Sequence, residues 1–223
     1  MRRFTIRSKA DLIAAIDEFG ILPFFSNSIA GFSIEEHIAP RLWFTENEGP
    51  WEWKGPVIRE TGCGYGKFFE HKAAFVSPRW FLTLANFRRD GYDFDARCDD
   101  GLVALKDQAL YTLIDRNAPI ISKSLKQLGD YRKGGNKGFD TVINRLEHQC
   151  YVVISDFVYM TDRNGEPYGW GVAEYSTPER LMGAAFTDAV YTESPEQSYE
   201  KLFAHLTSLF PDEDADTLCR FLR

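Results

Sequence analysis

The sequence predicts an α+β protein in which a winged helix-turn-helix accompanies small β-hairpins and a helical C-terminal tail. Three observations predict this fold class. Apolar residues recur with helical spacing between residues 139 and 146, and two β-rich stretches flank an Asn-Gly pair between residues 151 and 175. In addition, Ser, Thr or Asp residues precede several periodic stretches, in the position where their side chains cap a helix.

The first hundred residues combine capped helices with short β-rich pieces. Ser8 is expected to cap a helix that stops at Gly20, and Ser33 opens a short helix with the form of a capping box. Ser77 and Pro78 open another helix, because proline at the first helical position gives up only an amide that has no partner there. Between the last two helices, β-rich pieces predict a small sheet or a second hairpin at 57–60, 65–69 and 73–76.

Residues 90–101 are dense in aspartate and glycine and are expected to form a loop between two parts of the chain. A helix that begins near Asp107 and ends before Pro119 supplies the first helix of the winged unit, and residues 121–128 supply the next. Residues 129–136 form a long basic turn. The expected domains are an N-terminal α+β half (1–100), a winged helix-turn-helix (101–176) and a C-terminal helical segment (177–223).

The helix at 139–148 is the clearest element. Phe139, Val142, Ile143 and Leu146 form one apolar face, which leaves the opposite face free to meet a partner. Residues 151–160 and 168–175 are expected to be strands, joined through a tight turn in which Asn164-Gly165 adopts positive φ angles. A further helix is expected to begin at Thr177-Pro178, and residues 198–210 and 212–222 are expected to be helical.

Composition narrows the functional classes. A net charge of −7 over 223 residues argues against indiscriminate binding of polyanions, yet residues 119–150 carry six basic and three acidic residues, a local charge of +3. The cysteines and histidines are scattered without metal-ligand spacing, so we expect reduced thiols, no metal and no cofactor. With neither a signal peptide nor a stretch of about 20 apolar residues, the expected location is the cytoplasm, without membrane contact.

Several stretches resemble one family. They are Tyr65-Gly66-Lys67-Phe68-Phe69, residues 72–77, Trp80-Phe81, Asn86-Phe87-Arg88-Arg89 and residues 168–179. With the winged helix they cover most of the chain, and they are similar to uncharacterised bacterial proteins related to the AlkZ/YcaQ winged-helix DNA glycosylases. The resemblance implies tandem winged-helix-like units that grip duplex DNA in a concave cleft. It also implies excision of a damaged base as the activity of the better-known members.

One motif of those glycosylases is missing. They carry a glutamine-apolar-glutamine or glutamine-apolar-aspartate motif that positions the attacking water, and no two glutamines here are separated by a single residue. No catalytic residue is therefore transferred from the family. Glu52 and Glu60 are speculative replacements, because a glycosylase needs a group that holds water beside an aromatic surface.

Two sets of residues are candidates for contact with DNA. Trp51-Glu52-Trp53-Lys54, taken as extended, places its rings and its charges on opposite faces, and burial of the tryptophans in a core or lid is the favoured alternative to a cleft. Helix capping is favoured over phosphate contact for Arg88-Arg89. Phosphate contact and simple solvation are equally balanced for Lys123, Lys126, Lys133, Lys137 and Arg145. The nucleic-acid-binding candidates are Lys123, Lys126, Arg132, Lys133, Lys137, Arg145 and Arg163, and the cleft candidates are Trp51, Trp53, Lys54, Lys67, Arg88 and Arg89.

The sequence thus supports three hypotheses. The first is a double-stranded DNA-binding winged-helix protein related to base-excision glycosylases, whether or not it retains their chemistry. The second is an active glycosylase that uses a replacement residue. The third is a protein-interaction module of the winged-helix class that does not bind DNA, which the acidic total charge favours.

Overall fold

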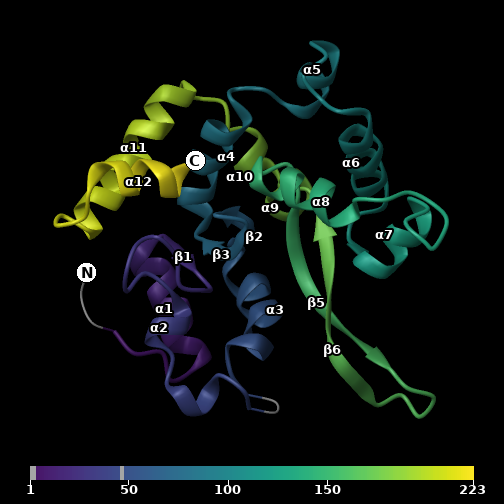
Figure 1. Cartoon of the computed structure of the whole chain (residues 1–223), viewed down its shortest axis with the longest axis horizontal. Helices are drawn as coiled ribbons and strands as arrows, with labels where there is room; N and C mark the ends of the chain where they lie inside the picture. Colours follow the sequence, from purple (N-terminus) through teal and green to yellow (C-terminus); the bar gives the residue numbers. More distant parts are fainter. Residues whose placement is uncertain (1–3, 46–47) are drawn as a thin grey trace.

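The computed structural model describes residues 4–45 and 48–223, and it confirms an α+β protein with two small antiparallel sheets. The first sheet has the strand order β1-β3-β2 and the second the order β4-β6-β5. Each sheet belongs to a run of helices and strands that is continuous in the sequence (Figure 1).

The first run, here called the first unit, spans residues 9–76. Gly20, at φ +70°, ends its first helix as expected, and Ser33 accepts a hydrogen bond from the amide of Glu36 to start the second. Its elements are α1 (Lys9–Phe19), β1 (Ile21–Pro23), α2 (Ile34–His37), the 3-10 helix η1 (Pro40–Leu42), α3 (Pro50–Thr61), β2 (Gly64–Phe69) and β3 (Lys72–Val76).

The second run, here called the second unit, spans residues 105–176. Between the two units lie α4 (Pro78–Arg89) and α5 (Phe94–Asp99). Its elements are α6 (Leu105–Asn117), β4 (Ile120–Ile121), α7 (Ser122–Leu128), α8 (Phe139–His148), β5 (Val153–Thr161) and β6 (Pro167–Ser176).

The two units repeat one topology. Apart from η1, each runs helix, short strand, helix, helix, strand, strand, and in each sheet the third strand lies between the first and the second. A helix with proline at its first position follows each unit, α4 after Ser77 and α9 (Pro178–Met182) after Thr177. The chain is therefore a structural tandem, although its sequence shows no repeat.

The units pack reciprocally, each placing its third helix against the other. Helix α3 of the first unit lies on β5 of the second, α8 of the second unit lies on β2 of the first, and β2 contacts β5. Lys67 on β2 donates a hydrogen bond of 2.9 Å to the side-chain oxygen of Asn144 on α8, and Arg59 on α3 pairs with Asp156 on β5. We call this interface the seam.

The C-terminal segment is helical, and its longest helix packs against α4 (Figure 1). It continues after α9 with α10 (Ala184–Thr187), α11 (Pro195–Leu209) and α12 (Ala215–Leu222), and α11 packs along α4. Ser194 and Gln197 form a full capping box at the start of α11.

Three local expectations need correction. Residues 50–61 form α3, so Trp51-Glu52-Trp53-Lys54 is helical rather than extended and 57–60 is not a strand; Pro50 at the first position of the helix favours this start. Helix α5, capped by Asp93, interrupts the loop expected at 90–101. In the hairpin turn only Gly165 has a positive φ, because the Asp162 carboxylate accepts from the amides of Asn164 and Glu166 and holds a wider loop.

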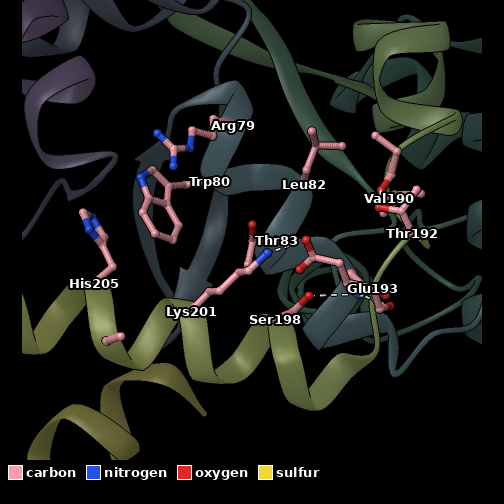
Figure 2. Close-up of a pocket in the computed structure, with 13 residues that line it drawn as sticks. Arg79, Trp80, Leu82, Thr83, Val190, Thr192, Glu193, Ser198, Lys201 and His205 are labelled. Atoms are coloured by element: carbon pink, nitrogen blue, oxygen red, sulfur yellow. Dashed lines mark hydrogen bonds and ion pairs between the residues drawn. The ribbon is translucent and has the colours of Figure 1, made fainter.

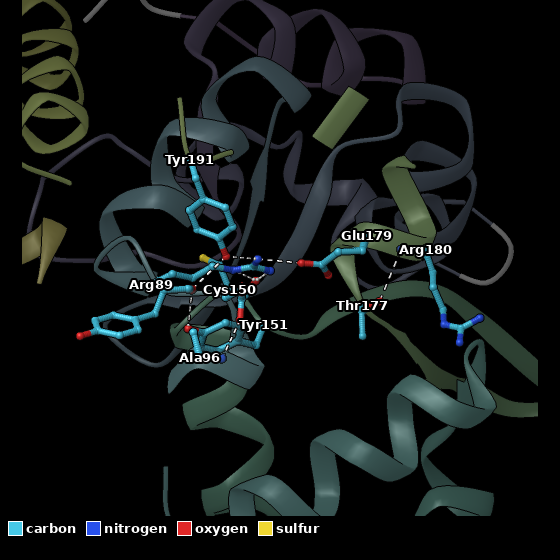
Figure 3. A network of polar contacts seen from close by, with 10 residues as sticks. Arg89, Ala96, Cys150, Tyr151, Thr177, Glu179, Arg180 and Tyr191 are labelled. Carbon is cyan, nitrogen blue, oxygen red and sulfur yellow. Dashed lines mark hydrogen bonds and ion pairs between the residues drawn. The ribbon is translucent and has the colours of Figure 1, made fainter. Parts of the chain in front are cut away.

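Arg89 ties α4 to the segments that follow the second unit (Figure 3). Its guanidinium, 1% exposed, donates to Glu179 at 2.7 Å, to the hydroxyl of Tyr191 at 2.9 Å and to the carbonyl of Cys150 at 2.8 Å. Burial alone would lower the pKa of Arg89, but Glu179 and Tyr191 outweigh it and raise the pKa above its usual value. The residue is a charged, fully satisfied part of the core.

Replacement of Arg89 should therefore destabilise the fold. We expect Arg89→Met to lower the free energy of unfolding by about 3 kcal/mol, because it leaves the Cys150 carbonyl and the Glu179 carboxylate without their donor. Urea unfolding followed by circular dichroism measures this. Arg180→Met, at a half-exposed neighbouring arginine, is the matched control and should change stability by less than about 0.5 kcal/mol. Equal effects of the two substitutions would contradict the assigned role.

The seam also buries a carboxyl group, that of Glu147 on α8. The residue is 1% exposed, and one of its oxygens has no hydrogen-bond partner among residues 4–45 and 48–223. Burial raises its pKa to about 8, and the nearby Lys67 opposes this only in part. The side chain is therefore protonated at neutral pH.

This pKa predicts a pH-dependent stability. Between the ordinary pKa of glutamate, 4.5, and about 8, the folded chain holds a proton that the unfolded chain releases, so the free energy of unfolding falls as pH rises through this window. Glu147→Gln should remove that fall, of at most about 1.4 kcal/mol per pH unit. Unfolding of both proteins between pH 5 and 8.5 measures it, and parallel pH profiles would show that Glu147 does not titrate this way.

Candidate nucleic-acid interface

Most of the predicted basic residues of the second unit are exposed. Lys123 on α7 and Arg132, Lys133 and Lys137 in the loop before α8 all face solvent, and none forms an ion pair within the described part of the chain. Lys126 is half-buried and lies 3.7 Å from Asp140. These cations are available to phosphate groups without first breaking an internal pair, with Lys126 the exception.

The free face of α8 is narrower than the sequence indicates. Arg145 makes two hydrogen bonds, of 2.6 and 2.7 Å, to the buried carboxylate of Asp107 on α6. Asn144 and Glu147 face β2, and His148 bonds to Arg88, so this side of the helix lies in the seam. Only the side with Asp140, Thr141 and Arg145 stays open, because the reciprocal packing uses a second face of α8.

The hairpin of β5 and β6 extends away from the rest of the second unit (Figure 1). All residues from Thr161 to Trp170 are exposed, including Arg163 in the loop. The β6 strand carries a bulge, since Val158 pairs with Val172 while Met160 pairs with Tyr168. Gly169, at φ +71°, makes the bulge possible, and Trp170 lies within it.

That bulge brings Trp170 to an aromatic row. Trp170, 70% exposed, meets Trp51 of α3 with ring centroids 6.4 Å apart, and Trp51 meets Trp43 at 5.6 Å. Trp43 in turn contacts Phe44, which is 81% exposed. We call these four residues the aromatic row. It joins the first unit to the hairpin of the second and presents rings to solvent at both ends.

The other cleft candidates of α3 lie beside this row. The Glu52 carboxylate accepts a hydrogen bond from the hydroxyl of Tyr159 on β5. The ammonium of Lys54 lies 3.9 Å from the centre of the Phe157 ring and 4.9 Å from that of Trp51, and burial lowers its pKa to about 8. Trp53 packs against the core.

The remaining candidates are placed elsewhere. Glu60, at the exposed end of α3, pairs with Lys9, and Lys67 is engaged by Asn144 in the seam. Arg88 donates to the carbonyls of Phe68 and Arg223 and to His148, and burial lowers its pKa to about 10. With Arg89 in the core, both arginines have partners in other segments of the chain. None of these partners is a carbonyl at the end of α4, where the sequence predicted helix capping.

Sequence reasoning missed Tyr159, Phe44 and Trp170 as parts of the site. The glycines on either side of Trp170 were the one available signal, because a glycine inside a strand indicates a bulge. It also missed a cavity of about 530 Å³ between α4 and α11, where Trp80 stacks on His205 and Lys201 pairs with Glu193 (Figure 2). None of the predicted site residues lines that cavity.

Neither a metal site nor a membrane-spanning helix is found in the described part of the chain. Among residues 4–45 and 48–223, no group of three or more His, Cys, Asp or Glu side chains could hold a metal ion. In the same described ranges, no helix has the length and apolar character needed to cross a bilayer. All four cysteines are free thiols.

Comparison with known proteins gives one match. No curated protein and no solved structure matches the chain. The family model described as AlkZ related, however, matches residues 6–223, which include both units, the seam and the C-terminal helices. The chain therefore belongs to the AlkZ-related family.

Proposed function

We propose that this protein binds double-stranded DNA through two winged-helix units, residues 9–76 and 105–176, as a relative of base-excision DNA glycosylases. The observation that carries the proposal is the doubled topology. In each unit three helices and a short strand precede a β-hairpin, and the sheet order β1-β3-β2 repeats as β4-β6-β5, which supports the interpretation of each unit as a winged helix. Membership of the AlkZ-related family supports the link to glycosylases.

Charge indicates which surface meets the DNA. The chain as a whole is acidic, so binding must concentrate where unpaired cations gather. The loop 129–138 with α7 supplies Lys123, Arg132, Lys133 and Lys137, and the hairpin loop adds Arg163. We assign the phosphate contacts to these residues rather than to Arg145, whose guanidinium already serves Asp107.

The open side of α8 is short, so we do not place this helix deep in a groove of the DNA. The wing and the basic loop contact the backbone, and the aromatic row between the units faces the distorted part of the duplex. Rings at the surface suit unstacked bases, because base–aromatic stacking contributes about 1 to 3 kcal/mol per base. This arrangement fits a protein that inspects damaged DNA.

Phosphate contact predicts a defined response to salt. Lys137→Gln and Lys133→Gln should each weaken binding to a duplex and reduce the slope of log affinity against log salt by about 1, because each removes one released counterion. Fluorescence anisotropy with a labelled duplex between 50 and 300 mM salt measures the slope.

The matched control for this experiment is Arg7→Gln, which removes one exposed positive charge just before the first unit. It should leave the slope unchanged. If the control and the two lysine variants behave alike, the effect is one of total charge and the assigned surface is wrong. A wild-type affinity that does not respond to salt would exclude phosphate contacts altogether.

The surroundings of the two speculative catalytic carboxylates support a choice between them. Glu52 lies beside the aromatic row and is oriented by Tyr159, whereas Glu60 pairs with Lys9 at the other end of α3. A carboxylate that holds water next to aromatic rings is what hydrolysis of an N-glycosidic bond requires. We therefore assign the role of positioning water to Glu52.

This assignment predicts the behaviour of two variants on a panel of alkylated and crosslinked duplexes. Wild-type protein should release damaged bases and leave abasic product, Glu52→Gln should lose about 100-fold in rate, and Glu60→Gln should keep the wild-type rate. Alkali cleavage of the abasic strand is the measurement. A panel without any product would leave DNA binding as the function and exclude the enzyme.

One observation favours a second candidate function, that of a protein-interaction module. Leu105 on α6 is 83% exposed and borders a small pocket against Tyr131, and Leu128 on α7 is also exposed. Apolar residues at the surface are typical of a docking site. A protein partner retained by the wild-type chain and lost with Leu105→Asp, together with no affinity for DNA, would establish this function instead.

A further inference from the structure

Lys54 has an environment unlike that of an ordinary surface lysine. It lies in the first turns of α3 over the rings of Phe157, Trp51 and, at 6.0 Å, Phe24. Within residues 4–45 and 48–223 its ammonium makes neither a hydrogen bond nor an ion pair. Glu52 raises its pKa by its charge, but desolvation prevails and brings the pKa to about 8.

Such a lysine differs chemically from the other cations of this face. A lysine whose pKa is lowered by desolvation has a larger fraction of neutral amine near neutral pH than a hydrated lysine has, and only the neutral amine can attack a carbonyl carbon. Lys123, Lys133 and Lys137 are exposed and serve as fixed positive charges. Lys54 is half-buried.

The position of Lys54 relates it to DNA. Trp51, which Lys54 contacts, also contacts Trp170 of the hairpin, so the amine lies beside the aromatic row. A nucleotide without its base leaves a gap in the duplex that exposed rings can fill. Its sugar, in equilibrium with the open aldehyde, would then lie next to the amine.

We propose that Lys54 forms an imine with the aldehyde carbon of an abasic deoxyribose and cleaves the strand by β-elimination. This inference rests on the proposed DNA binding but requires no release of a base. The cluster of an unpaired amine, a carboxylate at Glu52 and surface rings supplies each group that the reaction needs.

The steps balance without an oxidant or a reductant. The amine of Lys54 attacks C1′, the new carbon–nitrogen bond forms and the aldehyde oxygen leaves as water. The Glu52 carboxylate takes a proton from C2′, the C3′–O3′ bond breaks, and the downstream strand leaves with its 5′-phosphate. Water then hydrolyses the imine, which returns the free amine and leaves an unsaturated aldehyde on the upstream strand.

Borohydride trapping tests the proposal directly. A duplex with one aldehydic abasic site is incubated with the whole chain and sodium borohydride, which reduces an imine to a stable secondary amine. We expect a covalent protein–DNA complex whose modified peptide contains Lys54, and a trapping rate that rises with pH up to about 8. Lys54→Arg keeps the charge but has no nucleophilic amine, so it should give no complex.

Two further variants separate the role of Lys54 from that of Glu52. Glu52→Gln should still be trapped, but its strand cleavage should fall by about 100-fold, because only the elimination uses the carboxylate. Lys72→Arg, at a half-exposed lysine of the β2–β3 hairpin, should behave like the wild type in both assays.

The outcomes distinguish this inference from the proposed function. Salt-dependent binding to the same duplex without any trapped complex, or with the complex mapped to another amine, would overturn the role of Lys54 and leave DNA binding in place. Absence of binding both to this duplex and to the intact duplex would overturn the role of Lys54 and the proposed DNA binding together. Circular dichroism of Lys54→Arg, with its long cationic side chain retained, verifies that the loss is not one of folding.

Discussion

The reciprocal packing of the two units is the constraint on which the rest of the structure depends. Helix α3 covers β5 and helix α8 covers β2, so each unit completes the burial of the other. The seam contains Lys67 with Asn144, Arg59 with Asp156 and the buried carboxyl of Glu147. Because the same two helices would be the DNA-reading helices of two separate winged helices, this packing decides how much of either helix remains available.

That constraint places the candidate chemistry at the joint between the units. The N-terminal turns of α3 emerge from the seam next to the hairpin of the second unit, and the bulge at Trp170 completes a row of rings that neither unit could form alone. Glu52 and Lys54 contact Tyr159 and Phe157 of β5 for the same reason. In the proposed function, contacts to the DNA backbone belong to a basic loop on one unit, and the chemistry belongs to an aromatic row that both units share.

Local rules of the sequence were sufficient for much of the fold. The cap at Ser8, the stop at Gly20, the apolar face of α8 and the β5–β6 hairpin all follow from interactions within a few residues. The extended conformation taken for Trp51-Glu52-Trp53-Lys54 was wrong, because Pro50 and contact with β5 stabilise a helix there. Tertiary contacts overrode the local pattern.

The candidate site was less predictable, because it depends on contacts between distant parts of the chain. The short runs that contain Lys54 and Arg163 could be singled out from residue type alone, but their surroundings could not. The partnership of Arg145 with Asp107 joins residues 38 positions apart, and that of Glu52 with Tyr159 joins residues 107 positions apart. The tandem itself left no repeat in the sequence, since the two units share an order of elements and not a pattern of side chains.

The reciprocal packing of α3 and α8 also has a consequence for folding during synthesis of the chain. When residues 9–76 have left the ribosome, the face of β2 that α8 will cover is still open to water, and its cover is encoded some seventy residues later. The nascent first half must hold an incomplete hydrophobic core until residues 139–148 emerge and dock. We therefore expect the docking of the two units to be a late step of folding, and we expect a chain truncated between them to leave that face of β2 exposed to solvent.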